Sequence, residues 1–143
     1  PVKTVSRTSS KGHGFGLVYY AISWTILAIL FFDKPVIIAV GIAAMSYGDG
    51  FASLIGVKYG KRSYSIFGDK KSIEGSSAMF IFSILTMGIA LIYYSRMDFI
   101  NLVFITTAAL IATLVEGIAP KGLDNIGASL SAAISYFILL SII

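Results

Sequence analysis

Long apolar runs, separated by short polar segments, dominate the pattern along this chain. Five stretches approach the roughly 20 apolar residues that a helix needs to cross the hydrocarbon core of a bilayer. Each is apolar on all sides and lacks a strict alternation of apolar and polar positions, which disfavours transmembrane strands. The pattern therefore predicts about five membrane-spanning helices, at residues 15–32, 35–57, 76–95, 99–119 and 126–143.

The composition agrees with a membrane location. The chain has 143 residues, of which 57% are hydrophobic and 13% charged, whereas a soluble domain is usually about 45–50% apolar and about 25% charged. Pro35 suits the first turn of the second helix, where its missing N–H costs nothing. We predict an all-α integral membrane protein with a single transmembrane domain, residues 1–143. Because the first residue is Pro rather than Met, we expect a trimmed chain, which further N-terminal helices can precede.

Composition also excludes several classes of site and partner. The chain has no Cys, which rules out disulfides and cysteine-ligated metal sites, and its one His rules out a histidine-rich metal site. The net charge of +4 could suggest nucleic acid, but the basic residues lie in short segments between apolar runs. We therefore expect a lipid bilayer, and no nucleic acid, as the partner of this surface.

The Lys and Arg residues indicate the orientation of the helices. If five helices alternate, nine basic residues lie on one face and only Lys34 and Arg96 lie on the other. By the positive-inside rule the nine-residue face is cytoplasmic, in the plasma membrane of a prokaryote or in an endomembrane. The nine are Lys3, Arg7, Lys11, Lys58, Lys61, Arg62, Lys70, Lys71 and Lys121.

Two acidic residues fall inside predicted spans, where charge is costly and by default suggests function. Asp49 shares a predicted helix face with Ser46, Ser53 and Gly56, and Glu116 shares one with Ala109, Ala112 and Thr113. Small residues on these faces allow close helix packing or leave room for a ligand. The structural alternative is that each acid only hydrogen-bonds across helices.

The segment 58–75 is an 18-residue loop in this scheme, and loops of that length are often functional. Its lysines and glycines suit phosphate binding, and a helix beginning at residues 75–77 would offer free N–H groups to an anion. The alternative is a basic loop held against anionic lipid headgroups.

A second polar segment, 120–125, lies on the same face and contains Asp124, which could be only the N-cap of the last helix. Together the two segments and the spans bring acids and lysines to one membrane face. Carboxylates bind Mg²⁺, Mg²⁺ bridges phosphates, and lysines neutralise the remaining charge. The residues in question are Asp49, Glu74, Glu116, Asp124, Lys70, Lys71 and Lys121.

At these residues the chain resembles the CTP-dependent polyprenol kinases, the family of dolichol kinase, phytol kinase and CTP-dependent diacylglycerol kinase. The resemblance is carried by YGDGFASLIG at 47–56, KKSIEGS at 70–76, and EG at 116–117 with PKGLDN at 120–125. An Arg-Lys pair and a His, which family members usually have on an earlier helix, have no counterpart here.

The resemblance implies a kinase that transfers phosphate from CTP to a membrane lipid alcohol, with Mg²⁺ as cofactor and the loop 58–75 as the cytoplasmic nucleotide-binding segment. It implies catalytic roles for Asp49, Glu116 and Asp124, of which Asp49 and Asp124 would bind the metal. The implied nucleotide-binding residues are Gly56, Lys70, Lys71, Ser72, Glu74, Gly75, Lys121 and Asn125.

Two other functions remain open from the sequence. The same motifs resemble, less closely, the phosphatidate cytidylyltransferases, which make a CDP-lipid and release pyrophosphate. A small ion-coupled transporter is the alternative of another class, although the chain shows no inverted repeat. The product formed from CTP would distinguish the three. The identity of the alcohol and the oligomeric state are not encoded in these motifs.

Overall fold

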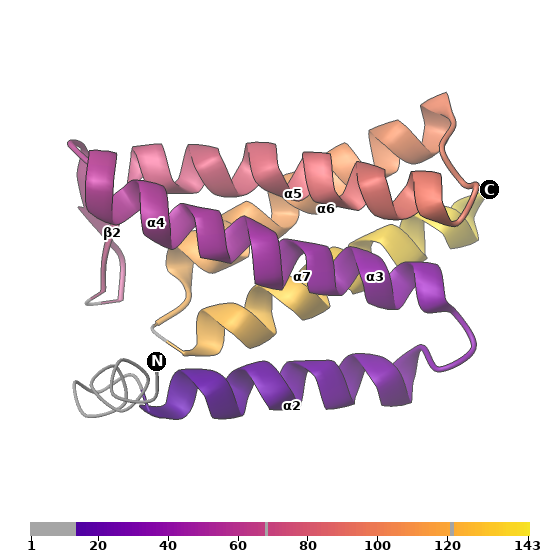
Figure 1. The fold of residues 1–143 in the computed structure, drawn as a ribbon, viewed down its shortest axis with the longest axis horizontal. Helices are drawn as coiled ribbons and strands as arrows, with labels where there is room; N and C mark the ends of the chain where they lie inside the picture. Colours follow the sequence, from indigo (N-terminus) through magenta and orange to yellow (C-terminus); the bar gives the residue numbers. More distant parts are fainter. Residues whose placement is uncertain (1–13, 68, 121) are drawn as a thin grey trace.

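The computed structural model describes residues 14–143 except 68 and 121. In this part of the chain the structure is almost entirely helical, with one short hairpin, as Figure 1 shows. The elements are α2 (Gly14–Leu30), α3 (Pro35–Ala43), the π-helix η2 (Ala44–Asp49), α4 (Gly50–Tyr59), β1 (Ser63–Ser65), β2 (Lys70–Ser72), α5 (Ile73–Tyr93), α6 (Phe99–Ile118) and α7 (Leu123–Ile142).

Four helices in the described residues are long and apolar enough to cross a membrane: Pro35–Tyr59, Ile73–Tyr93, Phe99–Ile118 and Leu123–Ile142. The first of these is continuous through α3, η2 and α4, and Pro35 occupies its first turn as expected. The remaining predicted span, 15–32, corresponds to α2, an apolar helix of 17 residues. The prediction of an all-α membrane protein is therefore confirmed, with four long helices and a shorter one.

The helices pack as a bundle in which α3, η2 and α4 lie between α5 and α7. α6 packs on α5 and α7, and α2 lies at the edge of the bundle against α7 (Figure 1). Helices α6 and α7 contact each other and each carries three fully buried alanines, small residues that let helices approach closely in a membrane. They are Ala108, Ala109, Ala112, Ala128, Ala132 and Ala133.

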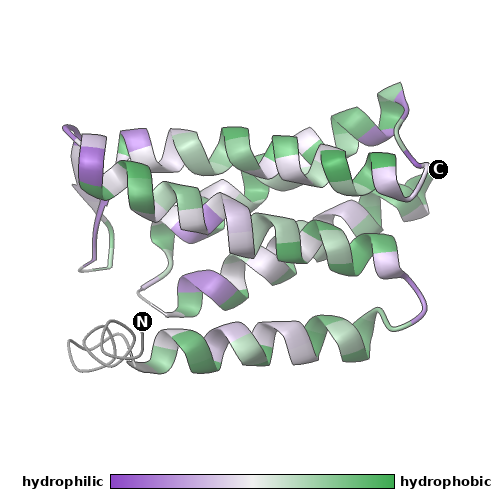
Figure 2. Cartoon of the chain, in the orientation of Figure 1, coloured by the Kyte–Doolittle hydropathy of each residue, from purple (hydrophilic) through white to green (hydrophobic). Residues whose placement is uncertain are grey.

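The outward surface of the bundle is apolar, as expected for helices in contact with lipid. On α5, four large aliphatic side chains recur at helical spacing and are each more than half exposed: Ile81, Leu85, Ile89 and Ile92. Figure 2 shows that hydrophilic residues concentrate at the two ends of the bundle and apolar residues along its length. This distribution matches a bilayer around the middle of the helices.

One end of the bundle carries the hairpin and the connection between α6 and α7, and the opposite end carries the C-terminus (Figure 1). The basic residues of 58–75 thus lie at one end, while Lys34 and Arg96, in the α2–α3 and α5–α6 connections, lie at the other. This agrees with the alternating topology predicted from the sequence. The basic residues Lys3, Arg7, Lys11 and Lys121 lie outside the described residues.

Candidate functional site

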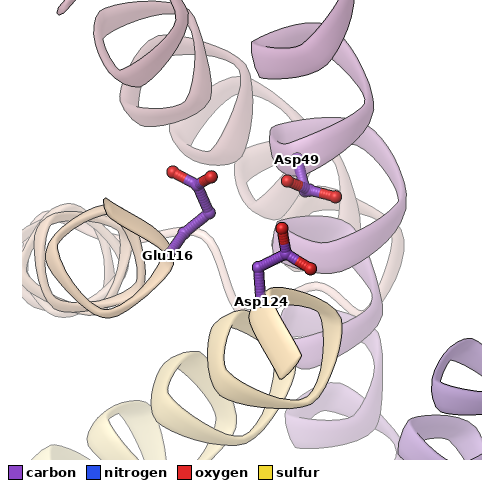
Figure 3. Close-up of side chains that lie close together, drawn as sticks. All are labelled: Asp49, Glu116 and Asp124. Atoms are coloured by element: carbon purple, nitrogen blue, oxygen red, sulfur yellow. The ribbon is translucent and has the colours of Figure 1, made fainter. Parts of the chain in front are cut away.

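Three carboxylates from three helices meet at the hairpin end of the bundle. Asp49 ends η2, Glu116 lies in the last turn of α6, and Asp124 lies in the first turn of α7. One oxygen from each can be chosen so that all three lie within 4.8 Å of one another, and Figure 3 shows the side chains pointing towards a common centre. Glu116 is buried, and the two aspartates are half-buried. The convergence predicted from the sequence is thus present in the structure.

Lys71 inserts its ammonium group between two of these acids. Nζ donates to Oε1 of Glu116 at 2.5 Å and to the main-chain carbonyl of Glu116, and it lies 3.6 Å from Oδ2 of Asp124. Burial alone would lower the pKa of Lys71, but the hydrogen bond and the charge of Glu116 and the charges of the aspartates outweigh it and raise the pKa. Lys71 therefore stays charged, and with all three acids ionised the cluster keeps two formal negative charges.

Asp124 is oriented by its own loop. Its Oδ1 accepts the backbone N–H groups of Gly122 and Asn125, each at 3.0 Å, which leaves Oδ2 facing Lys71. Gly122 precedes the helix with a φ of 93°, a backbone conformation that residues with a Cβ rarely adopt. The helix thus begins at Leu123 with Gly122 at the N-cap position, so the N-cap alternative for Asp124 is wrong. The carboxylate stabilises the turn with one oxygen and faces the cluster with the other.

Asp49 is the least restrained member of the cluster. Its side chain makes no hydrogen bond or ion pair with another residue in the described part of the chain, in contrast to Glu116 and Asp124. It also terminates a π-helix, a rare element that occurs mostly as single turns and often at functional sites. The carboxylate is therefore available to a cation or to a proton donor.

The π-helix changes one prediction about the helix faces. Ser46 was expected to lie on the face of Asp49, but its hydroxyl is 2.6 Å from the hydroxyl of Tyr20 on α2 and does not line the site. A π turn contains more residues than an α turn, which rotates the positions before it relative to those after it. The residues that end or follow this turn do share one face, which lines a cavity: Asp49, Ser53 and Gly56.

The cavity beside the carboxylates has a volume of about 510 Å³. It lies between the carboxylate cluster and the hairpin, and its wall contains eight of the residues that the sequence proposed: Asp49, Gly56, Lys70, Lys71, Ser72, Gly75, Glu116 and Asp124. The wall also contains four polar residues that were not predicted as site residues, Ser53, Ser63, Asp69 and Ser76. Two of the four had a signal in the sequence: Ser53 was expected on the face of Asp49, and Ser76 ends the KKSIEGS motif.

The segment 58–75, expected as an open loop, contains an antiparallel hairpin in which Tyr64 pairs with Lys71. Directly opposed residues lie on the same face of a two-stranded sheet. The hydroxyl of Tyr64 is 2.6 Å from Oγ of Ser76, and a Cβ on Gly117 would approach that hydroxyl to 2.8 Å. Tyr64 and Lys71 therefore contact α5 and α6 together and hold the hairpin over the carboxylates.

Glycines allow α4 and α5 to approach closely where the hairpin joins them. A Cβ on Gly75 would lie 2.8 Å from the carbonyl oxygen of Ala52, and a Cβ on Gly56 would lie 3.1 Å from Oγ of Ser72. Helix α5 begins at Ile73, earlier than the expected 75–77, because Oγ of Ser72 caps it by accepting the N–H of Gly75 at 3.0 Å. That N–H is therefore not free for an anion.

Two predicted nucleotide-binding residues lie away from the cavity wall. Oε2 of Glu74 accepts the backbone N–H groups of Lys61 and Arg62, and its Oε1 accepts Nε of Arg62, all at 3.2 Å. Asn125 donates from Nδ2 to the carbonyl of Gly16 at 3.4 Å. In this structure Glu74 anchors the start of the hairpin and Asn125 links α7 to α2. Lys121 lies outside the described residues.

The donor set fits a hard divalent cation. Mg²⁺ prefers oxygen ligands at about 2.0–2.1 Å, so two of its ligands lie at most about 4.2 Å apart. The carboxylate oxygens here lie within 4.8 Å of one another, so a small adjustment of the acids' positions would suffice. The ammonium of Lys71 already occupies a cation position between Glu116 and Asp124. Asp49, Glu116 and Asp124 are the residues that could hold the ion.

Comparison with known proteins finds the phytol kinases. The chain is 35% identical to a phytol kinase of Synechocystis sp. over 131 residues, which are 90% of this chain and 56% of that protein. It is 33% identical to a probable chloroplastic phytol kinase of Triticum aestivum, over 96% of this chain and 49% of that protein. The corresponding protein of Zea mays is 31% identical, over 98% of this chain and 49% of its own length.

The chain therefore spans about half the length of the curated relatives that it matches. No family model matches the chain. No solved structure matches it either. The relatives match over most of this chain, including the segments that carry the motifs, so the resemblance to the polyprenol and phytol kinase family is confirmed by homology.

Proposed function

Because homology to phytol kinases supports the polyprenol and phytol kinase family for this chain, we propose that it transfers the γ-phosphoryl group of CTP to a prenol-type lipid alcohol. One observation carries the proposal. Three helices bring Asp49, Glu116 and Asp124 together, and a hairpin adds Lys71, beside a cavity at the end of an apolar bundle. Such a site can receive a water-soluble nucleotide and a membrane-bound alcohol at the same time.

The lysines of the hairpin supply positive charge for the phosphates. Lys70 and Lys71 both line the cavity, and Lys70 is exposed and makes no ion pair with a described residue. Ammonium groups bind phosphate oxygens through charge-assisted hydrogen bonds. Gly56 and Gly75 lie in the same wall. In the proposal this wall binds the triphosphate, with Ser72 next to it.

Mg²⁺ is the proposed cofactor, and Asp49, Glu116 and Asp124 are the residues that would hold it. When bound, the ion would neutralise phosphate charge and so favour displacement at the γ-phosphorus. Its neighbour Lys71 is already paired with Glu116, so the ammonium would help to balance the acids while the nucleotide enters.

The reaction balances as R–OH plus CTP giving R–O–phosphate plus CDP and a proton. A bond forms between the alcohol oxygen and the γ-phosphorus, and the bond from that phosphorus to the β–γ bridging oxygen breaks. The proton leaves the alcohol. As an alternative to holding the ion, Asp49 would accept this proton, because its carboxylate makes no hydrogen bond or ion pair within the described residues. Proton removal by a positioned carboxylate contributes about 10²- to 10⁴-fold to rate.

The acceptor would approach from the bilayer. Val57, in the cavity wall, is 90% exposed and apolar, so the cavity is bordered by a surface that an isoprenoid chain can contact. We propose that this end of the bundle faces the cytoplasm, since it carries the basic hairpin and nucleotide is available there. The two-sided access is what a lipid kinase requires.

The test incubates the purified chain in lipid–detergent micelles with phytol, Mg²⁺ and CTP labelled at the γ-phosphate. We expect labelled phytyl phosphate and CDP in equal amounts, and less product with ATP, GTP or UTP. In a parallel incubation with phosphatidate in place of phytol, release of pyrophosphate with formation of a CDP-lipid would instead indicate a cytidylyltransferase. Absence of any lipid product with all four nucleotides would overturn the proposal and favour the transporter alternative, which ion uptake into proteoliposomes would then test.

A further inference from the structure

The hydroxyl of Ser83, in the middle of α5, has no hydrogen-bond partner although it is fully buried. Other hydroxyl residues of the same helix behave differently: Ser77 donates to the carbonyl of Ile73 at 2.8 Å, and Thr86 donates to that of Phe82 at 2.7 Å. Among the described residues, Ser83 holds the one buried side-chain oxygen or nitrogen without a partner. A buried hydroxyl without a partner is unfavourable, and alanine would avoid that cost.

The unpaired hydroxyl faces Gly48, the residue that precedes Asp49 in η2. A Cβ on Gly48 would collide with Oγ of Ser83, so the hydroxyl packs directly against the glycine backbone. Both residues are buried. The unpaired donor thus lies against the π turn that positions a carboxylate of the proposed cation site.

The carboxylate cluster indicates when the hydroxyl of Ser83 would find a hydrogen-bond partner. Its oxygens are separated by up to 4.8 Å, whereas the ligands of one Mg²⁺ lie at most about 4.2 Å apart. Glu116 and Asp124 are held by Lys71 and by the loop before α7, so adjustment to a cation falls to Asp49 and the turn that carries it. A shift of η2 changes which of its backbone carbonyls are paired within the helix, and a buried carbonyl needs a donor.

We propose that Ser83 is a positioning residue for Asp49. Its hydroxyl bonds a backbone carbonyl of η2 when Asp49 moves onto the cation, and it is left unpaired when the site holds no cation. This rests on the proposed function, in which Asp49 helps to hold Mg²⁺. Ser83 touches neither cation nor substrate and acts only through Gly48 and the π turn.

The primary test measures the Mg²⁺ concentration that gives half of the Mg²⁺-induced rise in unfolding temperature, without nucleotide, in detergent. We expect Ser83→Ala to unfold at the same temperature as wild type or higher without Mg²⁺, and to need about fivefold more Mg²⁺, as for loss of one hydrogen bond. Ser23→Ala is the matched control, because Ser23 is equally buried but donates to the carbonyl of Tyr19 on its own helix. It should leave the Mg²⁺ requirement unchanged.

A second pair of variants separates the hydrogen bond from simple packing. Gly48→Ala should lower both the unfolding temperature and the response to Mg²⁺, because its Cβ meets Oγ of Ser83. Combining it with Ser83→Ala removes the collision, so the unfolding temperature should recover while the Mg²⁺ requirement stays raised. Recovery of both properties in the double variant would show a purely steric role and overturn the inference.

Failure of the inference and failure of the proposed function give different results. If Ser83→Ala needs the same Mg²⁺ concentration as wild type, while Asp49→Asn no longer responds to Mg²⁺, the role of Ser83 is wrong and the cation site stands. If wild type itself shows no response to Mg²⁺, the cation site is wrong and the inference is overturned with it.

Discussion

The ammonium of Lys71 lies 2.5 Å from Oε1 of Glu116, although the two residues are 45 positions apart and belong to a hairpin strand and a membrane-spanning helix. This ion pair connects the segment outside the bundle to an acid buried within it. The side chains are only 12% and 7% exposed, so water screens the pair poorly. The hairpin is therefore held over the cavity by an ion pair between buried charges. Each charge is compensated by the other, so removing one leaves the other buried without a counter-charge.

Removal of Lys71 should destabilise the protein. We expect Lys71→Met to lower the free energy of unfolding by about 3 kcal/mol, since breaking a buried pair leaves Glu116 uncompensated. The pKa of Lys71 is raised above its ordinary 10.5 in the folded protein, so its contribution is fully present below pH 10.5 and is lost as pH rises through the folded pKa. The stability difference between variant and wild type should therefore stay constant up to about pH 10 and shrink above it.

Thermal unfolding in detergent across this pH range checks the prediction. Lys70→Met is the control, because Lys70 precedes Lys71 on the same strand but is exposed. A wild-type unfolding temperature for Lys71→Met at pH 7 would contradict the structural role of the pair.

Lys70 should matter for nucleotide binding and not for folding. We expect Lys70→Ala to weaken CTP binding about 10- to 150-fold, the effect of removing a hydrogen bond to a charged group worth roughly 1.5–3 kcal/mol. Its unfolding temperature should match that of wild type. Calorimetric titration with CTP measures the affinity, and Lys34→Ala, which removes an exposed lysine at the opposite end of the bundle, provides the control. Equal affinity in the two variants would favour contact with lipid headgroups instead.

Asp49 should be required for turnover. We expect Asp49→Asn to reduce phosphorylation of the alcohol by at least about 10³-fold, because an amide neither accepts the proton nor neutralises a cation. The fold should be retained, since the side chain makes no hydrogen bond or ion pair with a described residue. Comparing MgCTP affinity with rate separates the two roles: loss of a base leaves affinity near normal, and loss of a ligand weakens it. Asp33→Asn, at the far end of the bundle, should behave as wild type.

Gly75 should tolerate no side chain. We expect Gly75→Ala to destabilise the protein by about 1–3 kcal/mol, because the new Cβ would lie 2.8 Å from the carbonyl oxygen of Ala52. At Gly50, a Cβ would meet nothing within 4 Å, so Gly50→Ala should be neutral or stabilising by up to about 1 kcal/mol. Unfolding temperatures in the same detergent distinguish the two variants. Similar unfolding temperatures would contradict the close approach of α4 and α5 at Gly75.

The orientation in the membrane can be tested by cysteine labelling, because the chain has no Cys of its own. Ser63, on the hairpin, and Ser95, between α5 and α6, are both exposed and lie at opposite ends of the bundle. We expect an impermeant maleimide added to intact cells to label Ser95→Cys and to spare Ser63→Cys until the membrane is opened. Labelling of Ser63→Cys from outside would reverse the proposed topology.

The long apolar runs made most of this fold predictable from the sequence. A helix of about 20 apolar residues has few alternatives in a bilayer, and alternating topology then brings Asp49, Glu116 and Asp124 to one face. The features that the sequence did not reveal are short, local elements. Strands of three residues are too short for an alternating pattern to be recognised, so the hairpin and the contact of Tyr64 with Ser76 were missed.

The π-helix was also invisible in the pattern. One turn with extra residues leaves hydrophobicity unchanged but rotates the helix faces on either side, so Ser46 was placed beside Asp49 although it contacts Tyr20. For Glu74, the resemblance to the kinase family implied a role in nucleotide binding. In the structure its carboxylate accepts the backbone N–H groups of Lys61 and Arg62. These N–H groups need an acceptor only because of the path that the chain takes into the hairpin, which the sequence pattern does not show.

The carboxylate cluster joins three separate spans, and this makes its dimensions depend on the surrounding lipid. Helices α6 and α7 have 20 residues each, about 30 Å at 1.5 Å per residue, which is close to the thickness of a bilayer core. Helices in a thinner or thicker bilayer adjust by tilting. Because Glu116 ends one helix and Asp124 begins the next, unequal tilt changes the distance between their oxygens directly. Acyl-chain length in the host membrane thus acts on the geometry of the site without any contact between lipid and carboxylate.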